Sequence, residues 1–271
     1  MQEEVMHRLG VLGWPVAHSR SPAIHNAALA ALGMSDWHYQ LLPVPPELFA
    51  ETVRGLGGAG FVGTNVTIPH KQAALALADS ASEAARAIGA ANTLTFTADG
   101  TIAAENTDAP GLIAAIGEPL AAKRALVLGA GGSARAAVWA LREAGAADVA
   151  IWNRTGERAA ALARELTARA VSEPERAELL VNCTAVGLAP APGEELAQLG
   201  LTPALLGEFE TVVDLVYGER ETELAAAARA AGARTVDGRE ILVAQGATSF
   251  ELWTGREAPL QAMREAARAE R

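Results

Sequence analysis

The amino-acid sequence predicts an α/β protein built from two domains. Short apolar or β-branched runs alternate with alanine-rich patterns of helical period, which is the arrangement of βαβ units with parallel sheets. Runs before residue 106 end in polar clusters, whereas the run at residue 124 leads into a glycine-rich turn. We therefore place the division near residue 105. The strand-like runs cover residues 9–13, 60–68, 124–130, 148–154, 178–184 and 210–217.

The composition is that of a folded protein that binds a small molecule. With 271 residues and 50% hydrophobic content, the chain can bury two cores of moderate size. Its net charge of −10 argues against nucleic acid as a partner, because phosphate binding depends on clustered Lys and Arg. No run approaches the roughly 18 apolar residues that span a bilayer. We expect a cytoplasmic protein, as a monomer or homodimer, with no membrane segment.

Cysteine and histidine offer little for metal chemistry. Cys183 is the single cysteine, so it cannot form an internal disulfide, and we expect a small buried apolar side chain rather than a nucleophile. His18 and His25 have no third ligand at a recognisable metal spacing. No metal is expected.

The first candidate site is the stretch SRSP at residues 19–22. We expect Ser21 to be the N-cap of a helix that begins at Pro22, with Ser19 just before it. Capping alone would explain Ser21. Two hydroxyl groups at the positive end of a helix would equally suit a small carboxylate, and the residues by themselves favour neither interpretation.

The second candidate is NVTIPHK at residues 65–71. Asn65 and Thr67 occupy alternate positions at a strand end and therefore face the same way, and Pro69 stops the strand before Lys71 begins a helix. Lysine stands only at Lys71 and Lys123 in this chain. Because a lysine, unlike an arginine, can release and retake a proton, Lys71 is a candidate catalytic group.

Two more polar clusters follow, AANT at residues 90–93 and ENTD at residues 105–108. They contribute Asn92 and Asn106, whose carboxamides suit a hydroxyl-rich ligand. The second cluster precedes a helix expected at residues 106–117, which Thr107 or Asp108 would cap. Asp108 could serve as a cap, as a catalytic carboxylate, or as both.

The glycine-rich turn has the context of a dinucleotide-binding fingerprint. A buried strand leads through Gly129, Gly131 and Gly132 into a helix, with Ala134 at the third position of G-x-G-x-x-G/A. Such a turn allows close backbone approach to a pyrophosphate, which faces the amide groups of the helix N-terminus. We therefore expect nucleotide binding rather than a merely structural turn.

The next strand favours NADP over NAD. Where an NAD-specific protein usually has an acidic residue for the ribose hydroxyls, this chain has Asn153, Arg154 and Thr155, with Arg158 one helical turn later. Cations at this place suit a 2′-phosphate. The alternative is that both arginines are solvated surface charges.

These motifs together resemble the NADP-dependent shikimate dehydrogenase family. GWPVAHSRSPAIHNAAL, GTNVTIPHK, GAANT, ENTD, GAGGSARA, NRTGER, VNCTAVG, DLVY and DGREILVAQGATSFELWTG occur in the family's order and approximate spacing. The resemblance implies an N-terminal open α/β substrate domain plus a Rossmann-type dinucleotide-binding domain, with C-terminal helices returning to the first domain. The substrate domain would comprise residues 1–105 and 239–271, and the NADP domain residues 106–238.

The resemblance also implies the reaction, which is the reversible reduction of 3-dehydroshikimate to shikimate. Lys71 and Asp108 match the catalytic pair; we expect Lys71 to carry the proton, although either residue could. Residues that match substrate contacts are Ser19 and Ser21 for the carboxylate, with Asn65, Thr67, Asn92, Tyr217 and Gln245. Residues that match cofactor contacts are Gly129, Ala130, Gly131, Gly132, Ser133, Asn153, Arg154, Thr155 and Arg158, with Leu215 and Gly238 near the nicotinamide.

Two alternatives stay open at this point. One is a relative that acts on quinate or on an amino analogue of shikimate, with NAD or NADP. The other is a sensor that binds a dinucleotide without catalysis, which the retention of Lys71 disfavours. The chain also departs from the family pattern at Ala109, where glycine is usual, and in residues 218–224, which usually contain prolines.

Overall fold

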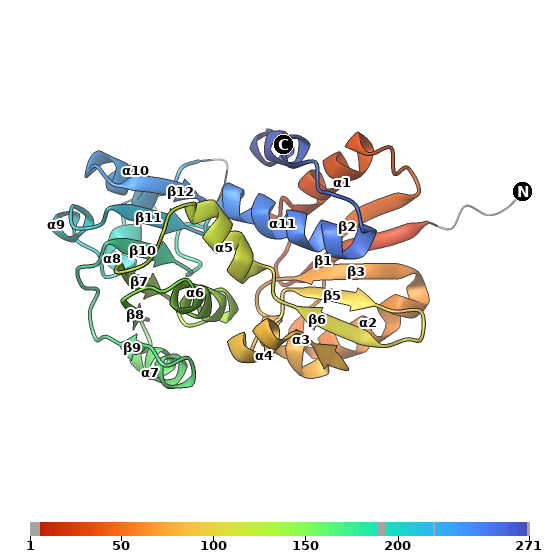
Figure 1. Ribbon diagram of the computed structural model, residues 1–271, viewed down its shortest axis with the longest axis horizontal. Helices are drawn as coiled ribbons and strands as arrows, with labels where there is room; N and C mark the ends of the chain where they lie inside the picture. The colour runs from red at the N-terminus through yellow and green to blue at the C-terminus, as the bar shows by residue number, and fades with distance from the viewer. Residues whose placement is uncertain (1–5, 189–192, 219, 270–271) are drawn as a thin grey trace, which may run out of the picture. The chain divides into compact units, whose positions relative to one another are not determined.

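A computed structural model describes residues 6–188, 193–218 and 220–269. The chain forms two compact units, one made of the residues up to Thr107 together with those from Leu242 onward, the other Asp108–Ile241. Both units are α/β (Figure 1), which confirms the predicted fold class, including the return of the C-terminal helices. The domain and segment predictions extend over some residues outside this description, namely 1–5, 189–192, 219 and 270–271.

The sheet of the first unit has the strand order β2-β1-β3-β5-β6-β4. β1 pairs in parallel with β2 and β3, whereas β5 is antiparallel to both β3 and β6. The expected parallel pairing therefore holds for only part of this sheet. The connection from β5 to β6 is too short for the crossover that a parallel pair requires. The strands are β1 His7–Gly13, β2 Trp37–Pro43, β3 Phe61–Val66, β4 Ser80–Ala81, β5 Thr93–Phe96 and β6 Ile102–Glu105.

Helices cover both faces of this sheet (Figure 1). On one face, α1, α11 and α12 share a core that includes Ile24, Phe250 and Met263. On the other face, α2 and α3 contribute Val53 and Ala74 to a second core with the strands. The helices are α1 Ser21–Ala31, α2 Phe49–Leu56, α3 Lys71–Leu77, α4 Glu83–Ile88, α11 Gly238–Thr254 and α12 Leu260–Arg268, with short 3-10 turns at Pro46–Leu48 and Gly57–Ala59.

Helix α1 begins one residue earlier than predicted. Ser21 is its first residue, and Arg20 occupies the N-cap position with helical backbone angles, φ −90° and ψ −2°. The side chain of Arg20 makes no capping hydrogen bond. The prediction that Ser21 is the N-cap is therefore wrong, because the backbone already turns helically at Arg20, and the Ser21 hydroxyl is not used for capping.

The second unit has a wholly parallel sheet in the order β12-β11-β10-β7-β8-β9. Helices α5, α6 and α7 cover one face through a core that includes Leu112, Val138 and Leu162. Helices α9 and α10 cover the other, with Leu206 and Leu224. The elements are β7 Arg124–Leu128, β8 Asp148–Trp152, β9 Arg169–Ala170, β10 Leu179–Asn182, β11 Thr211–Asp214, β12 Arg234–Asp237, α5 Asp108–Ile116, α6 Gly132–Glu143, α7 Gly156–Glu165, α8 Glu195–Gln198, α9 Pro203–Leu206 and α10 Glu223–Ala230.

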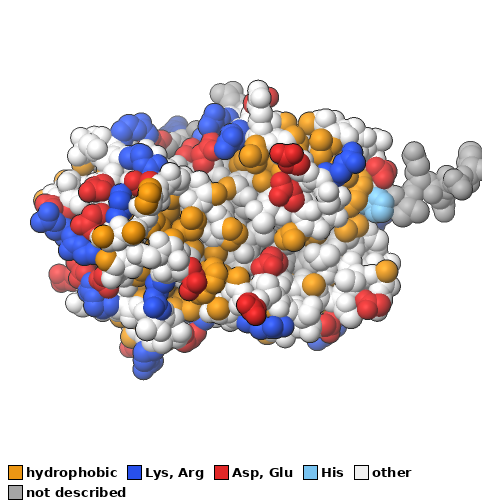
Figure 2. Space-filling model, viewed as in Figure 1, with side chains coloured by type: hydrophobic (Ala, Val, Ile, Leu, Met, Phe, Trp, Pro, Cys, Tyr) orange, Lys and Arg blue, Asp and Glu red, His pale blue; other side chains and the backbone are white. Residues whose placement is uncertain are grey.

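Surface charges of both signs lie close together on the second unit (Figure 2). Arg169 pairs with Asp148 and Glu175, and Arg124 pairs with Glu178. Among the residues that the structure describes, no helix is both long and apolar enough to span a membrane.

Candidate active site

Ser19 and Ser21 lie together at the start of α1. The Ser19 hydroxyl is 3.2 Å from that of Ser21 and accepts a hydrogen bond of 3.3 Å from the Ser21 backbone N–H. Ser21 is buried and Ser19 is half-buried. The structure therefore pairs the two hydroxyl groups that the sequence singles out.

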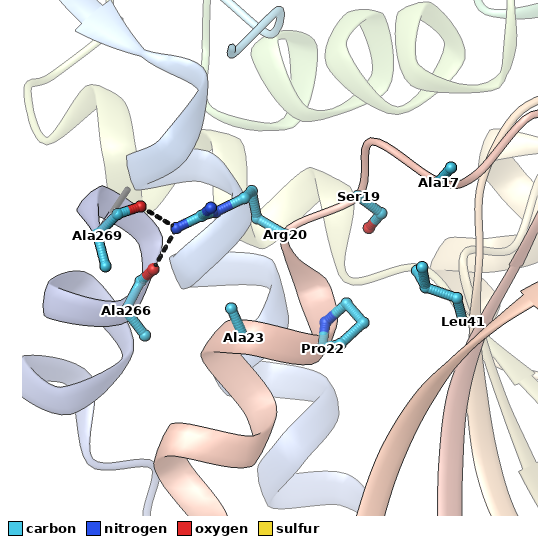
Figure 3. Close-up of a pocket in the computed structure, with 8 residues that line it drawn as sticks. All are labelled: Ala17, Ser19, Arg20, Pro22, Ala23, Leu41, Ala266 and Ala269. Carbon is cyan, nitrogen blue, oxygen red and sulfur yellow. Dashed lines mark hydrogen bonds between the residues drawn. The ribbon is translucent and has the colours of Figure 1, made fainter. Parts of the chain in front are cut away.

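Arg20, between these serines, points to the C-terminal helix. Figure 3 shows its guanidinium directed to the backbone carbonyls of Ala266 and Ala269, while Ser19 lies on the opposite side. The bond to Ala266 O measures 2.9 Å, and Ala269 O accepts a second bond from the same nitrogen. These carbonyls come from the last turn of α12 and the residue after it, which leave acceptors without intrahelical partners. Arg20 thus ties the start of α1 to the end of α12, beside an open pocket of about 540 Å³.

Asn65, at the end of β3, is the centre of a buried polar cluster. Tyr39 on β2 donates its hydroxyl to Asn65 Oδ1 at 2.8 Å. The Asn65 amide has three acceptors at 3.2–3.3 Å. They are Asn92 O just before β5, Thr93 Oγ1 on β5 and Ser249 Oγ on α11. Asn65 is only 4% exposed, so its carboxamide bonds to groups inside the fold. Thr67 lies one residue beyond the strand and is half-buried.

Asn92 forms a second, connected cluster with Thr107 and Gln245. Its amide donates to Thr107 Oγ1 at 3.0 Å and to Gln245 Oε1 at 3.2 Å, and its Oδ1 accepts the Thr107 backbone N–H at 2.7 Å. The Gln245 amide donates to Leu242 O at 2.8 Å. All three side chains are buried. Residues separated by more than 130 positions in the chain, such as Thr107 and Gln245, therefore meet here.

Lys71 and Asp108 each stand at the first residue of a helix. Lys71 begins α3, as predicted, and is only 8% exposed. Its backbone carbonyl accepts a bond of 2.9 Å from Ala91 N, which places the helix start next to the Asn92 cluster. Asp108 begins α5 and is half-buried. Asn106 is buried, and its amide donates to Ala90 O at 2.9 Å.

Sequence reasoning missed Tyr39 and Ser249, which bond to Asn65. A signal was available for Tyr39, since the chain has only two tyrosines and this one stands in an apolar strand pattern. It also missed the packing role of His25, whose ring stacks on that of Tyr39 with centroids 4.2 Å apart and planes 3° from parallel. Burial lowers the pKa of His25 to about 3, and the nearby Asn65 side chain acts in the opposite direction. Neither ring nitrogen has hydrogen-bond geometry to a described residue.

The glycine-rich turn of the second unit joins β7 to α6. Gly129 has a φ of +109°, and a Cβ on it would come within 3.2 Å of Cys183 O, so glycine is required. Gly131 occupies the N-cap position of α6 with open space around its Cβ position. Ala130, Gly132 and Ser133 complete the turn, and Ala134 is fully buried against the core. Cys183 is half-buried and packs on that core, so the expectation of a buried side chain is met only in part.

The end of β8 presents the expected cations. Arg154 and Arg158 are both exposed, one just after β8 and the other in the first turn of α7. Asn153 is half-buried and donates its amide to Thr155 O at 2.9 Å, which shapes the turn between them. An exposed pair of guanidinium groups at this position has room for an anionic ligand.

The ends of β11 and β12 approach each other closely. A Cβ on Gly238, the first residue of α11, would lie 2.6 Å from Leu215 O and 2.9 Å from Asp214 O. Both contacts are with backbone, which cannot move aside as a side chain can. Leu215 and Tyr217, which follow β11, are half-buried. In the part of the chain that the structure describes, no three His, Cys, Asp or Glu residues are grouped so as to hold a metal ion.

Three family models match the chain. They are the shikimate dehydrogenase substrate binding domain at residues 11–94, shikimate / quinate 5-dehydrogenase at residues 112–186, and the shikimate 5′-dehydrogenase C-terminal domain at residues 238–268. A shikimate dehydrogenase (NADP(+)) of Anaeromyxobacter dehalogenans is 47% identical over 92% of this chain and 91% of its own length. The chain belongs to the shikimate dehydrogenase family. The resemblance drawn from the motifs is thereby confirmed.

Solved structures of the shikimate dehydrogenase family agree in fold. Shikimate 5-dehydrogenase from Thermus thermophilus, in complex with NADP(H) and shikimate, is 45% identical, with a TM-score of 0.87 over 97% of this chain and 99% of that one. Shikimate dehydrogenase from Aquifex aeolicus is 33% identical, with a TM-score of 0.88 over 99% of this chain and 100% of that one. The shared fold extends over both units.

The residues of the second unit fit the NADP of this family. The open space at Gly131 leaves room for a pyrophosphate at the N-terminus of α6, where backbone N–H groups favour negative charge. Arg154 and Arg158 suit a 2′-phosphate, and Asn153 stands where an acidic residue would repel it. These groups are therefore compatible with NADP.

Proposed function

We propose that this protein catalyses the reversible, NADP-dependent reduction of 3-dehydroshikimate to shikimate. The observation that carries the proposal is the buried cluster of Asn92, Thr107 and Gln245 next to the start of α3, where Lys71 stands. Hydroxyl and carboxamide groups fixed in this way suit a ligand with several hydroxyl groups. A lysine at the same place supplies a proton donor for a carbonyl oxygen.

The roles of the two units follow from their donor groups. We assign substrate binding to residues 1–105 with 239–271, and cofactor binding to residues 106–238. Ser19 and Ser21 bind the substrate carboxylate at the start of α1. The other residues assigned to the substrate are Asn65, Thr67, Asn92, Tyr217 and Gln245, of which Asn65 acts by holding Asn92 and Thr93 in place.

Reduction of a ketone leaves negative charge on its oxygen, which a positioned acid must neutralise. In our proposal Lys71 donates a proton to this oxygen in reduction and accepts it in oxidation. Asp108 is its partner in the catalytic pair and binds a substrate hydroxyl. Proton transfer by a positioned group typically contributes about 10² to 10⁴-fold to the rate, which sets the scale expected for Lys71.

The cofactor residues act by binding and orientation. NADPH, when bound, supplies the hydride. The turn from Gly129 to Ser133 receives its pyrophosphate, Arg154 and Arg158 receive the 2′-phosphate, with Asn153 and Thr155 shaping that loop, and Leu215 and Gly238 flank the nicotinamide.

The test follows the absorbance of reduced nicotinamide while the protein is mixed with shikimate and NADP. The measurement is then repeated with NAD in place of NADP, and with quinate in place of shikimate. We expect reduction with shikimate and NADP only. Activity with quinate or NAD would instead assign a broader relative. Absence of activity in every combination, with NADP still binding, would overturn the proposal.

A variant separates catalysis from binding. Lys71→Ala should lower kcat by about 10² to 10⁴-fold with little change in the KM for shikimate, because the lost group acts in the transition state. Lys123→Ala is the matched control, since Lys123 pairs with Glu118 at 3.0 Å and has no assigned role in the reaction. An unchanged kcat in Lys71→Ala would refute the role of Lys71.

A further inference from the structure

Asn182 and Asp214 form a buried pair across two neighbouring strands of the second unit. They are the last residues of β10 and β11 and are partners in the parallel register. Asn182 Nδ2 donates to Asp214 Oδ1 at 2.9 Å, and the two residues are 0% and 3% exposed. The pair thus lies at the carboxyl ends of parallel strands, the edge at which α/β sheets bind ligands.

Each member of the pair also holds the loop that follows its own strand. Asp214 Oδ1 accepts the backbone N–H of Val216 at 3.1 Å. Asn182 Oδ1 accepts the backbone N–H of Thr184 at 3.1 Å and its hydroxyl at 2.8 Å. The two loops are therefore joined by this side-chain hydrogen bond, which adds to the backbone bond of 3.1 Å from Leu215 N to Asn182 O.

The other oxygen of Asp214 has a different task. Oδ2 accepts the hydroxyl of Thr222 at 2.6 Å, and Thr222 in turn caps α10 by accepting Ala225 N at 3.1 Å. Oδ1 thus serves the loops at the sheet edge, whereas Oδ2 serves a helix start. This division allows the two tasks to be tested separately.

A carboxylate at such a buried position is energetically unfavourable. Burial raises the pKa of Asp214 to about 6, and the nearby carboxylate of Glu195 acts in the same direction. Asp214 forms no ion pair within the described part of the chain, and the carboxylates of Glu223 on α10 and Asp237 on β12 lie on adjoining elements. A buried charge without a cation is normally unfavourable unless several donors satisfy it. Here three donors do so, and two of them set the loop geometry.

The neighbouring loops depend on the same edge. A Cβ on Gly129 of the pyrophosphate turn would lie 3.2 Å from Cys183 O, in a backbone conformation with a φ of +109° that favours glycine, and a Cβ on Gly238 would lie 2.6 Å from Leu215 O, which excludes a side chain. Asn182 and Asp214 sit between these two backbone contacts, because β10 and β11 lie between β7 and β12 in the sheet. The pair therefore links the loop beside the pyrophosphate turn to the loop that contains Leu215 and Tyr217.

We propose that Asp214 and Asn182 are positioning residues, which set the Leu215–Tyr217 segment relative to the pyrophosphate turn. The inference rests on the proposed function, in which Leu215 flanks the nicotinamide and Tyr217 contacts the substrate. It assigns to the pair a role in hydride transfer geometry, without contact with the reacting atoms.

The decisive variant is Asp214→Leu, which keeps a similar volume and removes both acceptor oxygens. We expect kcat to fall at least about 30-fold, while the Kd for NADP changes by less than about 3-fold, because other loops hold the phosphates. The fluorescence emission of bound NADPH should shift as well, since it reports the surroundings of the nicotinamide. Asp214→Asn, which keeps one oxygen for Val216 N and Asn182 Nδ2, should retain kcat within about 5-fold.

Thr222→Val is the matched control. It removes the bond to Oδ2 and the cap of α10, so it should lower the melting temperature but leave kcat within about 2-fold at a temperature where the protein is folded. If Thr222→Val lowers kcat as much as Asp214→Leu does, or if Asp214→Leu keeps the wild-type kcat and NADPH emission, the positioning role is refuted.

Two further outcomes, an unfolded Asp214→Leu variant and an inactive wild-type protein, have their own measurements. Should Asp214→Leu fail to fold, Asn182→Ala carries the test, with the same loss of kcat at a nearly constant Kd expected and a wild-type kcat refuting the role. A wild-type protein that binds NADP but oxidises no cyclic polyol would contradict the proposed function instead; the NADPH emission of the variants would still report the loop position.

Discussion

The hydroxyl of Tyr39 donates to Asn65 Oδ1 at 2.8 Å, across two strands that are separated by β1 in the sheet. This bond fixes the orientation of the Asn65 carboxamide, whose amide group then reaches Asn92 O and Thr93 Oγ1. The ring of Tyr39 is held in turn by His25, stacked 4.2 Å away. Tyr39, which is not itself assigned to the substrate, therefore helps to set the arrangement of residues that are.

Removing that hydroxyl should destabilise the protein. Tyr39→Phe leaves the buried Asn65 Oδ1 without its donor, which we expect to lower the free energy of unfolding by about 1–3 kcal/mol. Urea denaturation measures the change. Ser249→Ala is the matched comparison and should cost less, because the Asn65 amide keeps two other acceptors. Equal losses in the two variants would contradict the role given to Tyr39.

The buried His25 should make the stability of the protein depend on pH. Its pKa is lowered from 6.5 to about 3 by burial, so the unfolded chain binds a proton at a pH where the folded protein does not. The contribution of His25 to stability is therefore complete above pH 6.5 and is lost as pH falls toward 3. His25→Phe should flatten the slope of unfolding free energy between pH 4 and 6.5 by up to about 1.4 kcal/mol per pH unit. A slope that His25→Phe does not alter would contradict this account.

A substitution at Gly131 should affect cofactor binding without affecting folding. Apart from its chain neighbours and the backbone of its own helix, no heavy atom of the described residues lies within 4 Å of its Cβ position, and its φ is −92°, so Gly131→Ala should leave the melting temperature nearly unchanged. The added methyl group would occupy space that the pyrophosphate needs, and we expect the Kd for NADP to rise at least about 10-fold. Calorimetric titration measures this change. Gly55→Ala, on α2 with equally open surroundings, should bind NADP normally; wild-type affinity in Gly131→Ala would count against the assigned pyrophosphate turn.

Arg154 and Arg158 test the preference for NADP. Replacing both with alanine should raise the KM for NADP by about 10-fold or more while changing the KM for NAD little, because only NADP carries the 2′-phosphate. Steady-state kinetics with both cofactors measure the ratio. Arg164→Ala, also on α7 and exposed, is the control. If the double variant weakens NAD and NADP equally, the arginines do not read the 2′-phosphate.

Short-range patterns in the sequence predicted much of this protein. The strand, turn and helix around Gly129 lie within a few residues of one another, so their geometry depends on local backbone rules. The helix starting at Lys71 was predicted for the same reason, because Pro69 stops the preceding strand. Alternation of strands and helices gave the α/β class, and the family motifs identified the resemblance.

The tertiary structure decided what depends on distant residues. The antiparallel β5 and β6 in the first sheet, the start of α1 at Ser21, and the partners of Asn65 and Asp214 could not be predicted from local patterns. The sequence shows that a polar side chain needs hydrogen-bond partners, but tertiary packing determines which residues those partners are. Tyr39 and Asn65 are 26 positions apart in the chain, and Asn182 and Asp214 are 32 apart. The sequence by itself determined the kinds of chemical groups present, and the fold determined which of them hold the others in place, because a buried polar group is stable only where the packed chain brings it a partner.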